Sequence, residues 1–121
     1  HACDLLPTLA ELAGVQPPQV HLDGRSLVSV LRDPQAASPH DGEALHWQVG
    51  TGANADWAVR EGDWKLVGNT LDTSPHDGHY QRVTRLLVNI KTDPGETTNL
   101  ADQHPEIVAH LQRLHDEHLL Q

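Results

Sequence analysis

The spacing of the apolar residues changes twice along this chain of 121 residues, and that change constrains the fold more than any other feature. Leu5, Leu9 and Leu12 recur at helical spacing, whereas apolar and polar residues alternate through residues 43–90. After Pro105 the helical spacing returns. A period near 3.6 indicates helices and a period of two indicates strands. The order of helices, then strands, then a last helix predicts an α+β fold.

The first part of the chain is expected to form two short helices and a loop. Asp4 is a candidate N-cap of the first helix, and Gly14 follows its last turn. A second helix is expected from Arg25 or Ser26 to Arg32. We therefore expect a helical segment over residues 1–42 and a subdomain with a sheet over residues 43–121.

The first predicted strand has two chemically different faces. Leu45, Trp47 and Val49 point to one side, and His46 and Gln48 point to the other. The apolar side is expected to belong to the core.

A β-hairpin is expected around Glu61-Gly62-Asp63, between strands at 57–60 and 64–67. A two-residue turn, either Glu61-Gly62 or Gly62-Asp63, gathers the apolar side chains on one face, whereas a three-residue loop splits them. The first turn places Glu61 at a positive φ angle, and the second sets Arg60 opposite Lys65, a pair of like charges. The sequence leaves both turns open. The shared face carries Trp57, Val59, Trp64 and Leu66.

The next segment contains a polar stretch, a strand and a turn. Residues 69–82 are polar and are expected to form a loop or an insertion. Strand character returns over residues 83–90, where Leu86, Val88 and Ile90 alternate with other residues. The run 93–96, Asp-Pro-Gly-Glu, predicts a type II turn in which Gly95 takes the positive φ angle.

The last helix is predicted from Pro105 to about Leu119, because proline suits the first position of a helix. Its apolar stripe consists of Ile107, Leu111, Leu114 and His118, flanked by Val108 and His115. A small sheet with one bare apolar face is marginal in water. We therefore expect an antiparallel sheet of three to four strands, covered by this helix and preceded by the two short helices. The residues expected beneath the helix are Trp57, Val59, Trp64, Leu66, Val88 and Ile90.

Charge and cysteine content exclude several classes of function. Eight basic and 17 acidic residues give a net charge of −9, which argues against a nucleic-acid partner. The single cysteine, Cys3, excludes an internal disulfide and a four-thiolate zinc site. The apolar runs are shorter than a membrane span requires, so we expect no membrane partner. Because the chain begins with histidine and contains no methionine, we expect it to be a fragment of a longer protein. The sequence does not indicate a cellular compartment.

Four segments resemble the C-terminal part of sulfatases, the sulfate-ester hydrolases of the alkaline-phosphatase-like superfamily. They are "DLLPTLAELAG" at 4–14, "LDGRSLVSVLR" at 22–32, "AVREGDWKLV" at 58–67 and "DPGETTNLADQHPEIVAHLQRL" at 93–114. The resemblance implies that residues 1–42 join a catalytic domain and that residues 43–121 form the C-terminal subdomain. The expected partner is therefore the N-terminal catalytic domain of the same parent chain.

The resemblance also implies where the chemistry lies. Sulfatases carry formylglycine in a Cys/Ser-x-Pro-x-Arg motif and bind a divalent cation, usually calcium. Cys3 is followed by Asp-Leu-Leu-Pro and does not match that motif. No segment corresponds to the cation ligands, so both groups are expected in the parent's catalytic domain, with no cofactor in this fragment. The run 47–49, Trp-Gln-Val, departs from the family's "WEH"-like run and places a substrate contact there in doubt.

No side chain is assigned as catalytic, substrate-binding or metal-ligating, because a structural role is favoured for each candidate. The candidates are the thiol of Cys3; a histidine group on the last helix, His110, His115 and His118; a loop group that could bind a metal, His76, Asp77 and His79; a tryptophan platform for carbohydrate, Trp47, Trp57 and Trp64; and a cationic pair that could attract sulfate esters, Arg60 and Lys65.

The predicted function is thus the C-terminal subdomain of a sulfatase-like enzyme, which packs on the catalytic domain and helps to close the substrate pocket. The chain alone is not expected to be catalytic. The alternative is a histidine-rich metal-binding or protein-interaction module.

Overall fold

The computed structural model describes residues 2–52, 55–72 and 78–120. The chain forms two compact units, residues 1–41 and 42–121, and each is described by itself. The first contains a 3-10 turn, Ala2–Asp4, and two α-helices, α1 (Leu5–Ala13) and α2 (Val28–Arg32). The second contains four strands and a helix: β1 (Leu45–Val49), β2 (Asp56–Glu61), β3 (Trp64–Asp72), β4 (Gln81–Asn89) and α3 (Pro105–His118).

Helix α1 begins and ends at the residues that the sequence predicts. Gly14 ends the helix in the left-handed conformation, with φ of 66°. Asp4 occupies the N-cap position, but its side chain makes no capping hydrogen bond. The Asp4 carboxylate is instead buried, where it accepts a hydrogen bond from a residue 21 positions along the chain.

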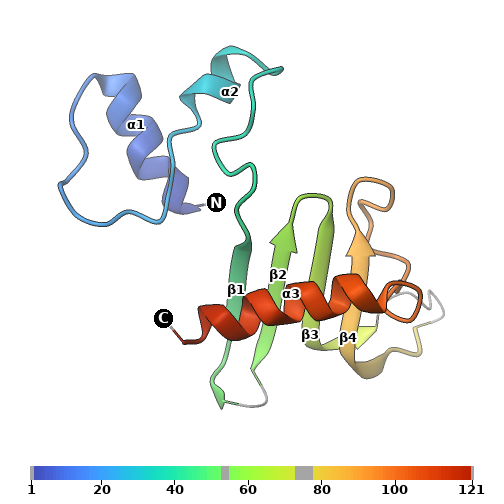
Figure 1. The fold of residues 1–121 in the computed structure, drawn as a ribbon. Helices are drawn as coiled ribbons and strands as arrows, with labels where there is room; N and C mark the ends of the chain where they lie inside the picture. Colours follow the sequence, from blue (N-terminus) through green and yellow to red (C-terminus); the bar gives the residue numbers. More distant parts are fainter. Residues whose placement is uncertain (1, 53–54, 73–77, 121) are drawn as a thin grey trace. The chain divides into compact units, whose positions relative to one another are not determined.

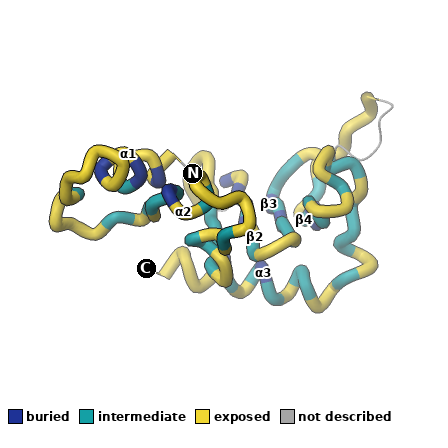
Figure 2. Tube along the Cα trace, turned by 90° about the horizontal axis from the view of Figure 1, so that it is seen from above, coloured by how far each residue is buried: buried dark blue, intermediate teal, exposed yellow. Residues whose placement is uncertain are grey.

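The apolar stripe of α1 faces outward. Figure 2 shows most of α1 in the colour of exposed residues, and the residues that the helix buries are Thr8 and Ala10. The leucine face, defined as Leu5, Leu6, Leu9 and Leu12, is between 49% and 61% exposed.

The second unit is one antiparallel sheet with strand order β1-β2-β3-β4, and α3 lies across it (Figure 1). The predicted α+β class and the sheet covered by a C-terminal helix are confirmed, with four strands. The core beneath the helix consists of Trp57, Val59, Leu66, Leu87 and Leu111.

The hairpin between β2 and β3 turns at Gly62-Asp63. Glu61 pairs with Trp64, and Gly62 takes the positive φ angle of 57°. Arg60 therefore lies opposite Lys65. Each of the two cations has its own partner. The Lys65 ammonium donates to the Glu96 carboxylate, and Arg60 Nε donates to the Gly62 carbonyl.

Two strands present a different face to α3 from the one predicted. Leu66 pairs with Leu87, so Leu87 faces the helix, and Val88 is buried on the opposite face. In β1, His46 pairs with Val59, so His46 shares the helix side. The expected burial of Val88 and Ile90 beneath α3 is thus wrong, because the register and not the alternation of apolar residues selects the face.

The burial of the tryptophans also differs from the prediction. Trp47 is 39% exposed and lies on the face away from α3, so it is not a core residue. Trp64 is partly buried, with its ring centroid 5.0 Å from that of His104. Trp57 is 7% exposed and is a core residue.

Two local predictions around β4 are wrong. Residues 69–72 and 81–82 were expected in a loop, but they extend β3 and β4, because Thr70 pairs with Val83 and Asp72 with Gln81. The turn at 93–96 closes through a Glu96 N–H to Asp93 carbonyl hydrogen bond of 3.1 Å. Its positive φ, 53°, falls at Glu96 and not at Gly95, so the turn is not type II.

Candidate functional site

The two N-terminal motifs meet at the buried carboxylate of Asp4. Asp4 Oδ1 accepts the Arg25 N–H at 2.9 Å and lies 2.9 Å from His40 Nε2. Burial raises the pKa of the Asp4 carboxyl, but the hydrogen bonds donated to it, including those from Arg25 and His40, outweigh burial and hold the pKa well below its usual range. Asp4 is therefore an ionised anchor for the segments that follow α1.

Thr8 and Gly24 complete this connection. Thr8 Oγ1 donates to the Asp4 carbonyl at 2.6 Å and accepts the Leu27 N–H at 3.0 Å. A Cβ atom at Gly24 would lie 2.0 Å from the Cys3 carbonyl oxygen, so only glycine fits there. The motif residues of this unit thus hold its backbone together, while the leucine face stays outward.

The "DPGETTNL" motif seals one edge of the sheet beside β4. The Leu100 N–H donates to the Leu87 carbonyl at 2.8 Å, and Asn99 Oδ1 accepts the Leu87 N–H at 3.2 Å. Asn99 Nδ2 donates to the Arg85 carbonyl at 3.2 Å. The Asn99 amide therefore replaces a neighbouring strand, which is one way to protect an edge.

Asp93 and Glu96 hold the turn that leads into this seal. Asp93 Oδ2 accepts the backbone N–H groups of Thr97 and Thr98 at 2.7 Å and 2.9 Å. Burial raises the pKa of Asp93, and the hydrogen bonds from Thr97 and Thr98 more than offset this and lower it. Glu96 accepts the Lys65 ammonium at 2.7 Å, so Lys65 already has an anionic partner and does not present an unpaired charge to a sulfate ester.

The histidines of α3 pack against aromatic rings. His115 stacks on Trp57 with ring centroids 3.9 Å apart, and His118 stacks on His46 at 4.2 Å. Burial lowers the pKa of His115 and of His46, and the nearby His118 lowers both further. Across residues 2–52, 55–72 and 78–120, no group of three His, Cys, Asp or Glu side chains is placed to hold a metal ion.

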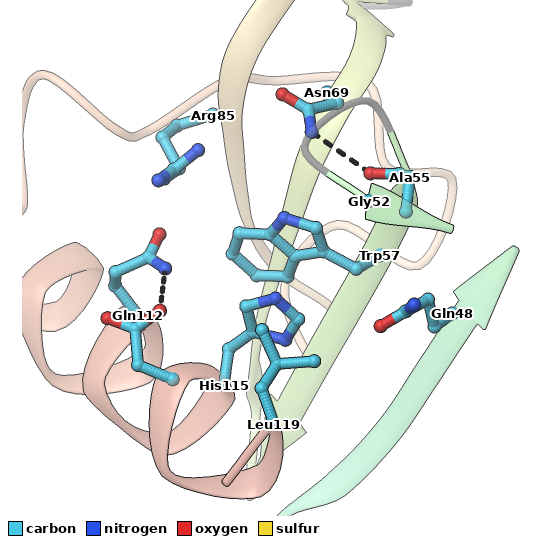
Figure 3. A pocket seen from close by; sticks show the side chains of 10 residues that line it. Gln48, Gly52, Ala55, Trp57, Asn69, Arg85, Gln112, His115 and Leu119 are labelled. Carbon is cyan, nitrogen blue, oxygen red and sulfur yellow. Dashed lines mark hydrogen bonds between the residues drawn. The ribbon is translucent and has the colours of Figure 1, made fainter. Parts of the chain in front are cut away.

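A cavity of about 440 Å³ opens beside the Trp57–His115 stack, between the sheet and the C-terminal half of α3 (Figure 3). Arg85 from β4 and Gln112 from α3 both line the cavity. The Arg85 guanidinium carbon lies 5.1 Å from the centroid of the Trp57 ring. Sequence reasoning missed this cavity, because no motif or spacing links residues that lie 27 positions apart.

The remaining candidates from the sequence are scattered. Cys3 is exposed at the start of the first unit, and His79 is exposed beside β4. His76 and Asp77 lie outside the described residues. His110 binds Glu61 at 2.7 Å, away from the stacked rings. None of the helices described is both long and apolar enough to cross a bilayer.

Comparison with known proteins finds sulfatases among the relatives of this chain. No protein-family model matches the chain. The chain is 33% identical over 117 residues to Arylsulfatase K of Xenopus laevis, a match that covers 91% of this chain and 20% of the relative. The chain thus spans about a fifth of the length of the curated relatives it matches.

Solved structures that share the fold include a sulfatase and a phosphonate monoester hydrolase. A 2-O GAG sulfatase superposes with a TM-score of 0.64 and 26% identity, over 97% of this chain and 24% of that chain. A phosphonate monoester hydrolase of Agrobacterium radiobacter shows the same fold at a TM-score of 0.50 and 24% identity, over 97% of this chain and 23% of that chain. In sequence and in fold, the chain matches the C-terminal part of a sulfatase.

Proposed function

We propose that the chain is the C-terminal subdomain of an enzyme that hydrolyses sulfate esters, that it packs on the catalytic domain, and that it helps to close the substrate pocket. The observation that carries the proposal is the match of the chain to the C-terminal part of sulfatases, over about a fifth of their length. In this proposal calcium and formylglycine belong to the catalytic domain of the parent protein, as the resemblance to sulfatases implies. Among the described residues, no group of three His, Cys, Asp or Glu side chains is placed to hold a metal ion.

The leucine face is the proposed contact with the catalytic domain. Its four side chains are about half exposed, although each fully buried leucine stabilises by about 1.5–3 kcal/mol. Covering the exposed halves of all four would contribute roughly 3–6 kcal/mol, enough to support a domain contact. The polar network around Asp4 packs against the opposite side of α1. The exposed leucines are therefore available to contact another domain.

Reconstitution from two pieces tests the proposal. The chain and the N-terminal part of its parent are purified separately, mixed, and assayed on a chromogenic aryl sulfate. We expect no turnover by either piece alone and turnover by the complex. Leu9→Asp should prevent association in size-exclusion chromatography, whereas Leu120→Asp, at a residue 88% exposed outside α1, should not.

Three results would contradict the proposal. The first is turnover by the pure, chelator-treated chain alone. The second is a failure of the two wild-type pieces to associate, and the third is equal behaviour of the two aspartate variants. A parallel assay on an aryl phosphonate ester decides the reaction class, because a phosphonate monoester hydrolase shares the fold.

A further inference from the structure

The last turn of α3 lies on the sheet through two pairs of stacked rings. His115 stacks on Trp57 of β2, with the ring centroids 3.9 Å apart and the ring planes 9° from parallel (Figure 3). His118 stacks on His46 of β1 at 4.2 Å and 8°. His46 also contacts the helix backbone, because its Nε2 lies 3.2 Å from the Leu114 carbonyl oxygen. We call the four stacked side chains the ring latch: His46, Trp57, His115 and His118.

The middle of the helix is held by other contacts. Leu111 is 1% exposed and belongs to the apolar core of the unit. His110 Nε2 lies 2.7 Å from the Glu61 carboxylate. After His115, all residues over 116–120 are exposed and bury no aliphatic side chain. The ring latch therefore carries the attachment of this end of α3 to the sheet.

The latch contains three imidazole rings, so it responds to protons. A backbone carbonyl only accepts hydrogen bonds, so Nε2 of His46 carries the proton in the contact with Leu114. When His46 and His118 both become imidazolium, two positive charges face each other with ring centroids 4.2 Å apart. A single charge leaves one ring of the pair neutral, so the full repulsion requires both protons.

The charged groups around the latch do not cancel this repulsion. Apart from the latch histidines, the charged or titratable side chains on this part of α3 and on the sheet face beneath it are Glu61, Arg85, His110, Arg113, Asp116 and Glu117. Each carboxylate in this set has its own partner, and the pairs are Glu61–His110, Asp116–Gln112 and Glu117–Arg113. The Arg85 guanidinium carbon lies 5.1 Å from the Trp57 ring centroid and adds positive charge there.

The closed latch disfavours proton uptake. Burial lowers the pKa of His115, the Asp116 carboxylate raises it, and the nearby cationic groups lower it further. Burial and His118 lower the pKa of His46, although hydrogen bonds to backbone groups of Leu114 and Ala44 raise it. A group whose pKa is lower in the closed state binds protons more tightly in the open state, so a falling pH shifts the equilibrium toward opening.

We propose that the last turn of α3 is an acid-released latch, which lies on β1 and β2 at neutral pH and leaves them when His46 and His118 are both protonated. Opening uncovers the ring of Trp57, which is 7% exposed in the closed form. The helix around Leu111 stays on the core, because protonation turns the His110–Glu61 contact into an ion pair. That gain comes with the loss of a hydrogen bond from Arg113 to His110 Nδ1 on the exposed side. The inference does not depend on the proposed reaction.

Nuclear Overhauser effects between ring protons test the inference in the full chain. Spectra are compared at about pH 7.5 and about pH 5.5, on either side of the ordinary imidazole pKa. We expect the effect between Trp57 and His115 to fall by about tenfold or more at the lower pH. The amide resonance of Leu100, which donates to the Leu87 carbonyl at 2.8 Å, should keep its folded position and show that the core is intact.

Two variants remove one charge each from the stacked pair. In His118→Gln and in His46→Gln, the contact between Trp57 and His115 should keep at least about half of its neutral-pH intensity in acid, because only one of the two charges can form. Glutamine at position 46 retains an N–H donor for the Leu114 carbonyl. The matched control is His110→Gln, on the same helix outside the latch, which should lose the contact in acid as the wild type does.

Four outcomes would overturn the inference. The first is a contact between Trp57 and His115 that survives acid in the wild type. The second is loss of that contact in both latch variants to the same extent as in the wild type. The third is a His110→Gln variant that retains the contact in acid. The fourth is movement of the Leu100 amide to its unfolded position together with the loss of the contact, because the whole unit would then unfold and no local release would exist.

Discussion

Replacing Gly68 by alanine should destabilise the second unit, because a tryptophan ring occupies the space of the new methyl group. Gly68 of β3 lies opposite Trp57 of β2. A Cβ atom there would stand 2.1 Å from Trp57 Cε2 and 2.3 Å from Nε1. Non-bonded carbon atoms prefer about 3.5–4.0 Å, so the ring would have to retreat by roughly 1.5 Å.

The residues around Trp57 leave its ring no space to move away. Trp57 is 7% exposed, and His115 lies against it at 3.9 Å. Overpacking of this kind costs about 1–3 kcal/mol. Changing Gly to Ala also reduces the conformational freedom of the unfolded chain, which stabilises the folded state by about 0.4–1 kcal/mol. Gly68 is not among the residues with positive φ, so backbone strain adds nothing, and the net loss of stability should be about 1.3 kcal/mol.

Urea unfolding followed by tryptophan fluorescence measures this loss. A domain of this size has an m-value near 1 kcal/mol per molar urea, so the midpoint of unfolding should fall by about 1.3 M. Trp57→Leu supplies the control, because a smaller side chain removes the clash. Gly68→Ala should then be neutral or slightly stabilising in the Trp57→Leu background. An unchanged midpoint for Gly68→Ala in the wild-type background would refute the reasoning.

Three further predictions follow from the same unit. His115 and His46 have lowered pKa values in the folded state, so the unfolded state binds more protons near pH 6.5. The free energy of unfolding should therefore be highest above about pH 7.5 and fall as the pH drops to 5. Thermal unfolding across this range measures the effect, and a Tm that does not change with pH would contradict it. Asn99→Ala should cost about 2–3 kcal/mol in urea unfolding, because it leaves the buried Leu87 N–H without an acceptor; a change below about 0.5 kcal/mol would mean that the edge is sealed by other groups. A chain ending at Asp102 loses α3, including its buried leucine at 111, and should show no cooperative thermal transition; a sharp transition with a dispersed amide spectrum would show that α3 is not the cover the sheet needs.

The sequence alone determined the elements whose signals are local. Pro105 and the apolar spacing after it predicted α3, and that helix indeed runs from Pro105 to His118. The two-residue hairpin turn was narrowed to two choices, of which the structure contains Gly62-Asp63. These features depend on backbone preferences of a few neighbouring residues, which the sequence states directly.

Which face each strand turns inward was decided only by the tertiary structure. The run 86–88 in β4 is buried on both sides, so its alternation does not distinguish the face toward α3 from the opposite face. Pairing of Leu66 with Leu87 makes that choice, and the same register turns His46 toward the helix and Trp47 away. The cavity between Arg85 and Gln112 is likewise a product of register, because β4 and α3 meet there through packing alone. The outward leucine face of α1 depends on the burial of Asp4 by partners up to 36 positions away, which the period of the helix does not reveal.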